Sequence, residues 1–174
     1  MKRIGVISDT HGWVDPQVGL LFAGVDHIIH AGDIGKVAVL DDLAAIAPVT
    51  AVSGNVDWSS GTELADLPAT AQLEIAGVRF FVAHMRGHIT QNWDLSKRGA
   101  GGECGAGSDG GAGGERGACV AVYGHSHRAE IERRDGILFL NPGAAGAARF
   151  GLPRSVALLE IDGDDLRPRI VDLE

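Results

Sequence analysis

The stretch Ile4-Gly5-Val6-Ile7-Ser8-Asp9-Thr10-His11 joins a short apolar run to a polar turn, and the same pattern occurs twice more in the first half of the chain. Residues 27–33 (HIIHAGD) and 49–55 (VTAVSGN) also pass from apolar residues into turns that hold glycine with a carboxylate or an amide. Residues 18–24 and 37–47 separate these segments and favour helices. Strands that alternate with helices indicate a mostly parallel sheet. Such sheets bind ligands just beyond the carboxyl ends of their strands.

The second half of the chain shows hairpin signals instead. Three turn dipeptides that end in glycine adjoin runs of strand-forming residues: Ala76-Gly77, Asp135-Gly136 and Asp162-Gly163. Short strands around such turns are typical of antiparallel pairing. The sequence therefore predicts an α/β fold whose core contains two mixed sheets.

The composition is that of an ordinary globular protein, and we expect residues 1–174 to form a single domain. Fifteen basic against 23 acidic residues give a net charge of -8, which disfavours binding to nucleic-acid polymers or to an anionic membrane surface. The N-terminal apolar run is too short for a signal peptide, so we expect a cytoplasmic protein. Cys104 and Cys119 lack the spacing of a zinc or redox motif and are expected to be reduced thiols.

Residues 99–117 break the pattern, because roughly every second residue there is glycine. Glycine costs about 1 kcal/mol relative to alanine in a helix, so a stable helix is not expected. A phosphate-binding loop is the alternative, but the Gly-Lys-Ser/Thr ending is missing. We therefore expect a flexible loop within the domain.

Metal-binding side chains follow the predicted strands. In Asp9-Thr10-His11 and His125-Ser126-His127 the outer residues lie two apart, which in extended backbone directs both side chains to one face. Each group alone is a weak signal, since a Gly-Asp turn or a lone histidine is more often structural. The ordered set carries the prediction of a metal site: Asp9, His11, Asp33, Asn55, His84, His125 and His127.

The types of these side chains indicate the kind of site. Carboxylate and imidazole without thiolate suit Mn²⁺, Fe²⁺, Zn²⁺ or Ni²⁺ in a site unlike a cysteine-lined structural zinc site. Seven candidates exceed what one ion needs, so two ions that share a ligand fit the number better. Asp33 is the candidate bridge, because the two oxygens of a carboxylate can hold two cations about 3.5–4 Å apart.

The motifs Asp9-x-His11, Gly32-Asp33, Gly54-Asn55, His84 and Gly124-His125-Ser126-His127 resemble, in order, the signature of the calcineurin-like metallophosphoesterases. The Gly54-Asn55-Val56-Asp57 form and Asn141-Pro142-Gly143 are similar to the small bacterial and archaeal phosphodiesterase branch, which also includes the retromer scaffold subunit. The resemblance implies a four-layer αββα sandwich with two metal ions at one edge. It assigns Asp9, His11, Asp33 and His127 to one ion, and Asp33, Asn55, His84 and His125 to the other.

The function that the resemblance implies is hydrolysis of small phosphodiesters by a metal-bridging hydroxide. Catalytic roles are assigned to Asp33, Asn55 and His84, and Mn²⁺ is the first choice of metal, with Ni²⁺, Fe²⁺ or Zn²⁺ as alternatives. A homodimer is a further expectation. The competing hypothesis is a scaffold like the retromer subunit, which binds protein partners with little or no catalysis.

The chain departs from the family pattern near the predicted second ion. Val56 replaces the histidine that assists the leaving group in phosphoprotein phosphatases, which disfavours that activity. Asp57, Arg86 and His88 are candidate substrate contacts. The alternatives are a turn cap for Asp57 and exposed surface positions for Arg86 and His88.

Overall fold

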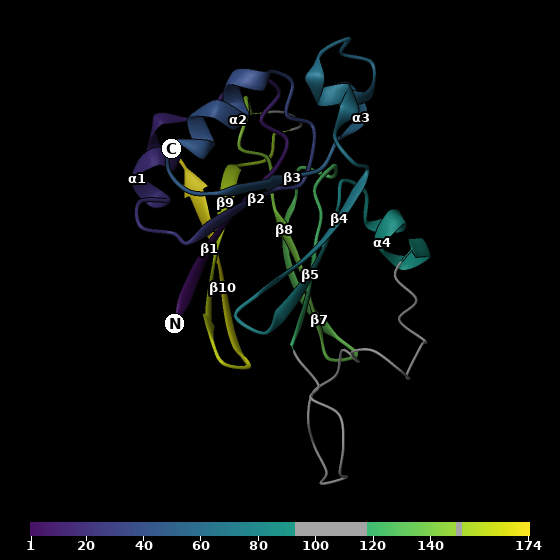
Figure 1. Ribbon diagram of the computed structural model, residues 1–174. Coiled ribbons are helices and arrows are strands. Elements are labelled where there is room, and N and C mark those ends of the chain that lie inside the picture. Colours follow the sequence, from purple (N-terminus) through teal and green to yellow (C-terminus); the bar gives the residue numbers. More distant parts are fainter. Residues whose placement is uncertain (93–117, 149–150) are drawn as a thin grey trace, which may run out of the picture.

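The computed structural model describes residues 1–92, 118–148 and 151–174, and this part of the chain forms two five-stranded sheets that pack face to face (Figure 1). Sheet A has the strand order β10-β9-β1-β2-β3, and sheet B has the order β4-β5-β6-β8-β7. The strands of sheet A are β1 (Lys2–Ile7), β2 (His27–His30), β3 (Val49–Ala51), β9 (Arg154–Asp162) and β10 (Asp165–Leu173). Those of sheet B are β4 (Thr70–Ile75), β5 (Val78–Ala83), β6 (Cys119–Val122), β7 (Ala129–Arg134) and β8 (Ile137–Pro142).

Both sheets combine parallel and antiparallel pairs, as the sequence predicts. In sheet A, β1 pairs in parallel with β2 and β2 with β3, while β9 joins β1 in the antiparallel sense. In sheet B, β5, β6 and β8 are parallel, and β4 and β7 close the two edges as hairpin partners. The parallel strands of each sheet bring several carboxyl ends to one edge.

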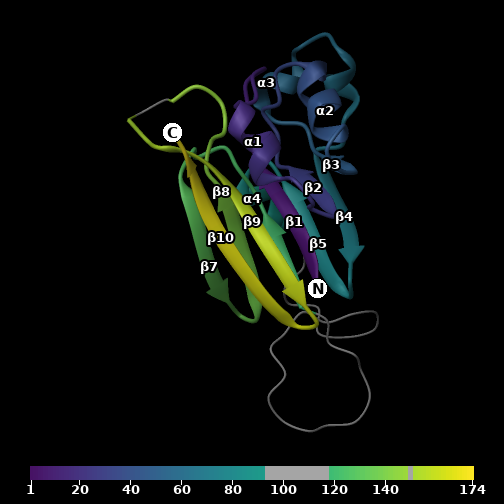
Figure 2. The same cartoon turned by 90° about the vertical axis from the view of Figure 1, so that its left-hand side faces the viewer.

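Helices cover the outer faces of the two sheets, so the fold has four layers, which Figure 1 shows from the side and Figure 2 shows with α1, α2 and sheet A toward the viewer. Helices α1 (Pro16–Leu21) and α2 (Val37–Ala44) lie on sheet A, where Phe22, Leu43 and their neighbours form one core cluster. Helix α4 (Arg86–Asn92) covers sheet B through Ile89. The largest cluster fills the space between the sheets, where Ile4 and Leu138 are buried. The expected αββα sandwich is confirmed.

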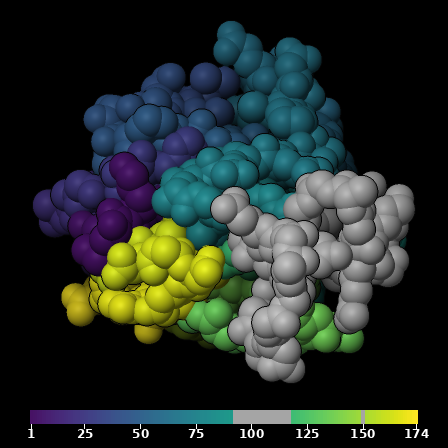
Figure 3. Space-filling model, turned by 60° about the horizontal axis from the view of Figure 1, so that its bottom comes forward, coloured from purple at the N-terminus to yellow at the C-terminus, as the bar shows by residue number. Residues whose placement is uncertain are grey.

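Short helical segments follow β3 at the upper end of the sandwich in Figure 1: α3 (Asn55–Trp58) and a 3-10 helix (Glu63–Asp66). The opposite end, which faces the viewer in Figure 3, carries the N-terminus and the turns of the β4–β5 and β9–β10 hairpins. The predicted ligands therefore gather at one end of the molecule, away from these hairpin turns.

The structure tests the expectation for Cys119 but not those for Cys104 and the glycine-rich segment. Cys119, which begins β6, is disulfide-bonded, so the expectation of a reduced thiol is wrong for this residue. The spacing of cysteines along the sequence does not show whether a sulfur atom reaches a bonding partner. Cys104 and the glycine-rich segment 99–117 lie outside the described residues. Among the helices of the described ranges, none has the length and apolar character needed to span a bilayer.

Ala76 tests the hairpin geometry, because it adopts a left-handed conformation, with φ 53°, in the β4–β5 turn. A left-handed alanine costs about 1–2 kcal/mol, whereas glycine has no such penalty. We predict that Ala76→Gly raises the free energy of unfolding by about 0.5–1 kcal/mol, measured by urea denaturation. Ala71→Gly, the same change inside β4, should lower it by about 1 kcal/mol. Equal losses in both variants would contradict the turn assignment.

Candidate metal centre

Five turns carry the seven predicted ligands, and most of these turns follow directly on a parallel strand. The turn after β1 holds two of them, the turn after β2 holds one, α3 begins with one, and the turns after β5 and β6 supply the others. In this order they are Asp9 and His11, Asp33, Asn55, His84, and His125 and His127. Because the carboxyl ends of these strands share one edge of the sandwich, residues far apart in sequence come together there.

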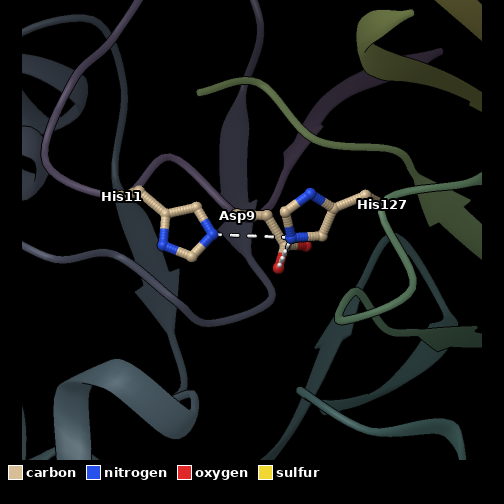
Figure 4. Close-up of side chains that lie close together, drawn as sticks. All are labelled: Asp9, His11 and His127. Carbon is tan, nitrogen blue, oxygen red and sulfur yellow. Dashed lines mark hydrogen bonds and ion pairs between the residues drawn. The ribbon is translucent and has the colours of Figure 1, made fainter. Parts of the chain in front are cut away.

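The first cluster contains Asp9, His11 and His127 (Figure 4). The ligand atoms of these three residues all lie within 4.8 Å of one another. The Nε2 atoms of His11 and His127 are 3.4 Å apart, and His127 Nε2 lies 3.3 Å from Asp9 Oδ1. Two ring nitrogens and a carboxylate oxygen that converge in this way form a ligand set for a divalent cation.

The second cluster contains Asp9, Asp33 and His84. His84 Nε2 lies 3.4 Å from Asp33 Oδ1, and the other oxygen of Asp33 lies 3.9 Å from His11 Nε2. Asp33 thus directs one oxygen toward a histidine of each cluster, the arrangement that a bridging carboxylate requires. Asp9 belongs to both groups, so the two clusters are continuous.

The polar atoms of Asp9 and His84 show that the site fits a cation. Asp9 Oδ1 and His84 Nε2 are buried, and neither has a hydrogen-bond partner among the described residues. Burial without a partner costs about 1–3 kcal/mol per group. His84 Nδ1 lies 2.8 Å from the Ala31 carbonyl oxygen, which can only accept, so Nδ1 carries the proton and Nε2 keeps its lone pair. A divalent ion would satisfy both atoms.

Asn55 and His125 lie at the exposed rim of the second cluster. The His125 ring centroid is 5.1 Å from that of His84, and the two rings are nearly perpendicular. Asn55 stands between Gly54 and Val56, and the Val56 N–H donates to Asp33 Oδ1 at 3.0 Å. The structure therefore brings both residues beside the second cluster, and their roles as ligands remain predictions.

The backbone of the ligand turns differs from the extended conformation expected from sequence spacing. Five predicted ligands have left-handed φ angles between 49° and 67°: Asp9, His11, Asp33, His125 and His127. The side chains converge because the chain reverses sharply after each strand, and the assumed strand alternation does not apply. Each such residue costs about 1–2 kcal/mol, a cost characteristic of functional sites.

Two glycines let the turns approach one another closely. A Cβ at Gly124 would lie 1.9 Å from Ser8 Oγ and 2.6 Å from Asp9 Oδ2. A Cβ at Gly54 would lie 2.3 Å from Asp33 Oδ1. Steric contact therefore explains why glycine precedes His125 and Asn55. A side chain at either position would displace the carboxylate of Asp9 or Asp33.

Hydrogen bonds fix the orientation of the carboxylates and of the turns. Asp9 Oδ2 accepts from Ser8 Oγ at 2.7 Å and from the His125 N–H at 3.0 Å. Asn141 donates to the Gly124 carbonyl at 3.0 Å and accepts from the Gly143 N–H, which holds the turn after β6. The sequence indicated Asn141 only through the family resemblance, because an Asn-Pro-Gly stretch by itself predicts a turn.

The His30 side chain connects the turn after β1 with the turn after β2. Its Nε2 lies 3.0 Å from Thr10 Oγ1, and its Nδ1 accepts from the Gly32 N–H. Complete burial lowers the pKa of His30 to about 4, so the ring is neutral near pH 7. A neutral ring can donate at one nitrogen and accept at the other, which suits both bonds.

Electrostatic pairing keeps Asp33 ionised in the metal-free protein. Burial acts to raise the pKa of Asp33, but the neighbouring His84 imidazole and the Val56 N–H outweigh it and lower the pKa to about 2. Burial acts to lower the pKa of His84, and the Asp33 carboxylate reverses this and raises it. A cation that enters the site therefore meets an ionised carboxylate and competes with a proton on the imidazole.

Asp57 is buried, and its carboxylate accepts from three backbone N–H groups. These belong to Gly54 at 2.8 Å, Ile34 at 3.1 Å and Gly35 at 2.9 Å. The turn-cap alternative therefore describes its observed contacts, and a substrate contact by Asp57 remains a prediction.

Arg86 lies on the outer face of sheet B. Its guanidinium pairs with Glu130 and Glu132, donates to Tyr123 and stacks over the ring of Phe139 at 5.1 Å. These contacts use the donors that would otherwise bind a phosphate. His88 is half-buried in α4. Substrate contacts by Arg86 and His88 remain predictions that these positions do not support.

Comparison with known proteins agrees with this geometry. Residues 1–164 match the model of the calcineurin-like phosphoesterase superfamily domain. A protein named probable metallophosphoesterase from Methanothermobacter thermautotrophicus is 33% identical over 174 residues, which cover 97% of this chain and 91% of the relative. A phosphodiesterase of Methanocaldococcus jannaschii is 23% identical, with 98% of this chain and 99% of that protein covered.

A solved structure with a similar fold is Vps29 of Chaetomium thermophilum. The two structures superpose with a TM-score of 0.68 at 17% sequence identity, and the match covers 99% of this chain and 97% of Vps29. At this identity the likeness establishes the fold alone.

Gly124 offers a test of the close packing behind Asp9. We predict that Gly124→Ala weakens Mn²⁺ binding at least about tenfold, because the added methyl group would displace Asp9 from its hydrogen bonds. Isothermal titration calorimetry measures the affinity. Gly19→Ala is the matched control, since no atom lies within 4 Å of the added carbon. Unchanged affinity in Gly124→Ala would show that Asp9 does not depend on this contact.

His30 makes the stability of the fold depend on pH. The unfolded imidazole takes up a proton near pH 6.5 and the folded one near pH 4, so the unfolded state binds more protons between these values. His30 should therefore remove about 2 kcal/mol of stability between pH 7 and pH 5. His30→Gln should lose less stability over this range in urea denaturation. Parallel losses in both proteins would refute the buried neutral ring.

Proposed function

The chain belongs to the calcineurin-like phosphoesterase superfamily, and we propose that it is a phosphodiesterase that binds two divalent ions and hydrolyses small phosphodiesters. The observation that carries the proposal is the convergence of Asp9, His11, Asp33, His84 and His127 at one edge of the sandwich. These side chains come from four separate turns, and all of them except His84 have left-handed φ angles. Similarity to an archaeal phosphodiesterase supports the choice of diesters.

The residues of the two clusters would hold the ions. Asp9, His11 and His127 surround one position, and Asp33 and His84 surround the other, with Asn55 and His125 at its rim. When bound, two divalent ions lower the pKa of a coordinated water and neutralise the charge on the phosphoryl group. Asp33 and Asp9 keep their orientation through bonds to Val56, Ser8 and His125.

The turn at α3 offers no proton donor for a leaving group. Val56 has no titratable side chain, and the Asp57 carboxylate is occupied by backbone N–H groups. This chemistry favours esters whose leaving group needs little protonation. We propose Asp33, Asn55 and His84 as the catalytic set, because they surround the side of the site nearest to this turn.

Mn²⁺ is the metal that we propose first, since carboxylate and imidazole ligands without thiolate suit it. Ni²⁺, Fe²⁺ and Zn²⁺ accept the same ligands. The chain carries a net charge of -8, so we propose a small substrate rather than a nucleic-acid polymer or a membrane. A cytoplasmic location and a homodimer complete the proposal.

The likeness to Vps29 keeps a scaffold function as the second candidate. The two hypotheses differ in metal content. A phosphodiesterase should bind close to two ions per chain, whereas a scaffold has no need of them.

Substitution of the bridging and first-cluster ligands tests the proposed function. We expect the purified protein to bind about two Mn²⁺ ions and to hydrolyse bis(4-nitrophenyl) phosphate only with metal. Asp33→Asn and His127→Ala should each lower turnover at least about a hundredfold, because each removes a ligand. Metal content is measured by atomic emission, and turnover by release of 4-nitrophenolate.

The matched control is His27→Ala, because His27 is a half-buried histidine that bonds to Thr50 in sheet A, outside the site. Its turnover should stay within a few-fold of the natural protein. Metal-independent turnover, or full activity in Asp33→Asn, would refute the dinuclear mechanism. Failure to bind any ion would favour the scaffold.

A further inference from the structure

The large hydrophobic side chains that face solvent are unevenly placed. Among the described residues, six are exposed: Met1, Trp13, Leu20, Val56, Trp58 and Ile131. Trp13, Val56 and Trp58 each lie within three positions of a predicted metal ligand. Single exposed hydrophobic side chains are common on protein surfaces, so the informative feature is that three of them lie close in sequence to the predicted ligands. Half of the exposed large hydrophobic side chains therefore lie next to the candidate metal centre in the sequence.

Val56 and Trp58 belong to the α3 turn that packs against Asp33. The Val56 N–H lies 3.0 Å from Asp33 Oδ1, so its side chain, 39% exposed, stands directly beside the second cluster. Trp58 follows Asn55 by three positions in a helical turn, which the Trp58 N–H closes on the Gly54 carbonyl. Residues three apart on a helix have Cβ atoms about 5–6 Å apart. The side chains of Asn55 and Trp58 therefore leave the α3 turn on the same side.

The Trp58 indole is held in place although it is 43% exposed. Its Nε1–H donates to Ser53 Oγ at 2.7 Å, and Ser53 is buried. This bond turns the polar edge of the ring inward, so that the ring presents carbon surface to solvent. A ring fixed in advance loses little side-chain entropy when a ligand stacks on it.

Trp13 differs from Trp58 in what covers its ring. The Arg154 guanidinium lies over Trp13, 5.3 Å from the ring centroid, and is itself paired with Asp15 at 2.6 Å. Trp13 therefore already has a cation on one face. Trp58 has no cation over its ring among the contacts of the described residues.

We propose that Trp58, with Val56, forms a stacking platform for an aromatic or heteroaromatic ring on the ester group that stays on the phosphate after hydrolysis, such as the base of a nucleoside. The inference rests on the proposed phosphodiesterase function and adds the class of diester. A phosphate at the second cluster places its ester substituent beside Asn55, where the exposed ring lies. Stacking of a base on an aromatic side chain contributes about tenfold or more to binding.

A pair of synthetic diesters separates stacking from chemistry. Bis(4-nitrophenyl) phosphate and methyl 4-nitrophenyl phosphate release the same leaving group, but only the first has a second ring. With Mn²⁺, we expect the natural protein to have a KM about tenfold lower for the first. Trp58→Leu should remove this difference, whereas Trp58→Phe should keep most of it. Trp13→Leu is the matched control and should keep the ratio of the two KM values.

Tryptophan fluorescence gives a readout that needs no turnover. Adenosine 5′-monophosphate and ribose 5-phosphate share phosphate and sugar and differ in the base. We expect the first to quench the emission of the natural protein and to bind about tenfold more tightly than the second. In Trp58→Phe, the quenching should largely disappear.

The outcomes distinguish the two proposals. If the natural protein hydrolyses neither diester with Mn²⁺, Ni²⁺, Fe²⁺ or Zn²⁺, the proposed function is wrong. If it hydrolyses both and Trp58→Leu leaves the KM ratio and the nucleotide affinity unchanged, the platform is wrong and the phosphodiesterase stands. A proportional loss with both diesters in Trp58→Leu would also refute the platform, because it would indicate a disturbed Asn55.

Discussion

The rest of the structure depends on one constraint. Polar atoms of the candidate metal ligands are buried close together at one edge of the sandwich. Asp9 Oδ1 and His84 Nε2 are buried without hydrogen bonds among the described residues, and both point into the space shared by the two clusters. An arrangement of this kind is costly in a metal-free protein. It becomes favourable when a divalent cation takes the place of the missing partners. The site is therefore built at the expense of local stability, as functional sites commonly are.

The surrounding fold holds this unfavourable arrangement in place. Parallel strands in both sheets bring the ligand turns to a common end, and the core between the sheets keeps those ends together. Close contacts at Gly54 and Gly124 leave the carboxylates little freedom. The neutral His30 ring connects the first two turns, and the Ala31 carbonyl sets the tautomer of His84. Each contact acts on the orientation of a ligand rather than on the metal itself.

The same turn that supports Asp33 also carries exposed hydrophobic side chains. Asp57 caps α3 from inside, so this carboxylate stabilises the turn, while Val56 and Trp58 face outward next to the second cluster. One short segment thus links ligand position to an exposed aromatic surface. Arg86, by contrast, lies on the outer face of sheet B, where it forms ion pairs with Glu130 and Glu132.

The amino-acid sequence by itself determined the alternation of strands and helices in the first half of the chain and the three hairpin turns, and it predicted the candidate metal ligands, because apolar periodicity and turn residues are local properties. Only the tertiary structure decided the convergence of Asp9, His11 and His127, the left-handed turns that produce it, and the disulfide at Cys119. It also decided that Asp57 is a cap and that Arg86 is paired. The physical reason is that these properties depend on contacts between residues far apart in the chain, which spacing along the sequence does not report.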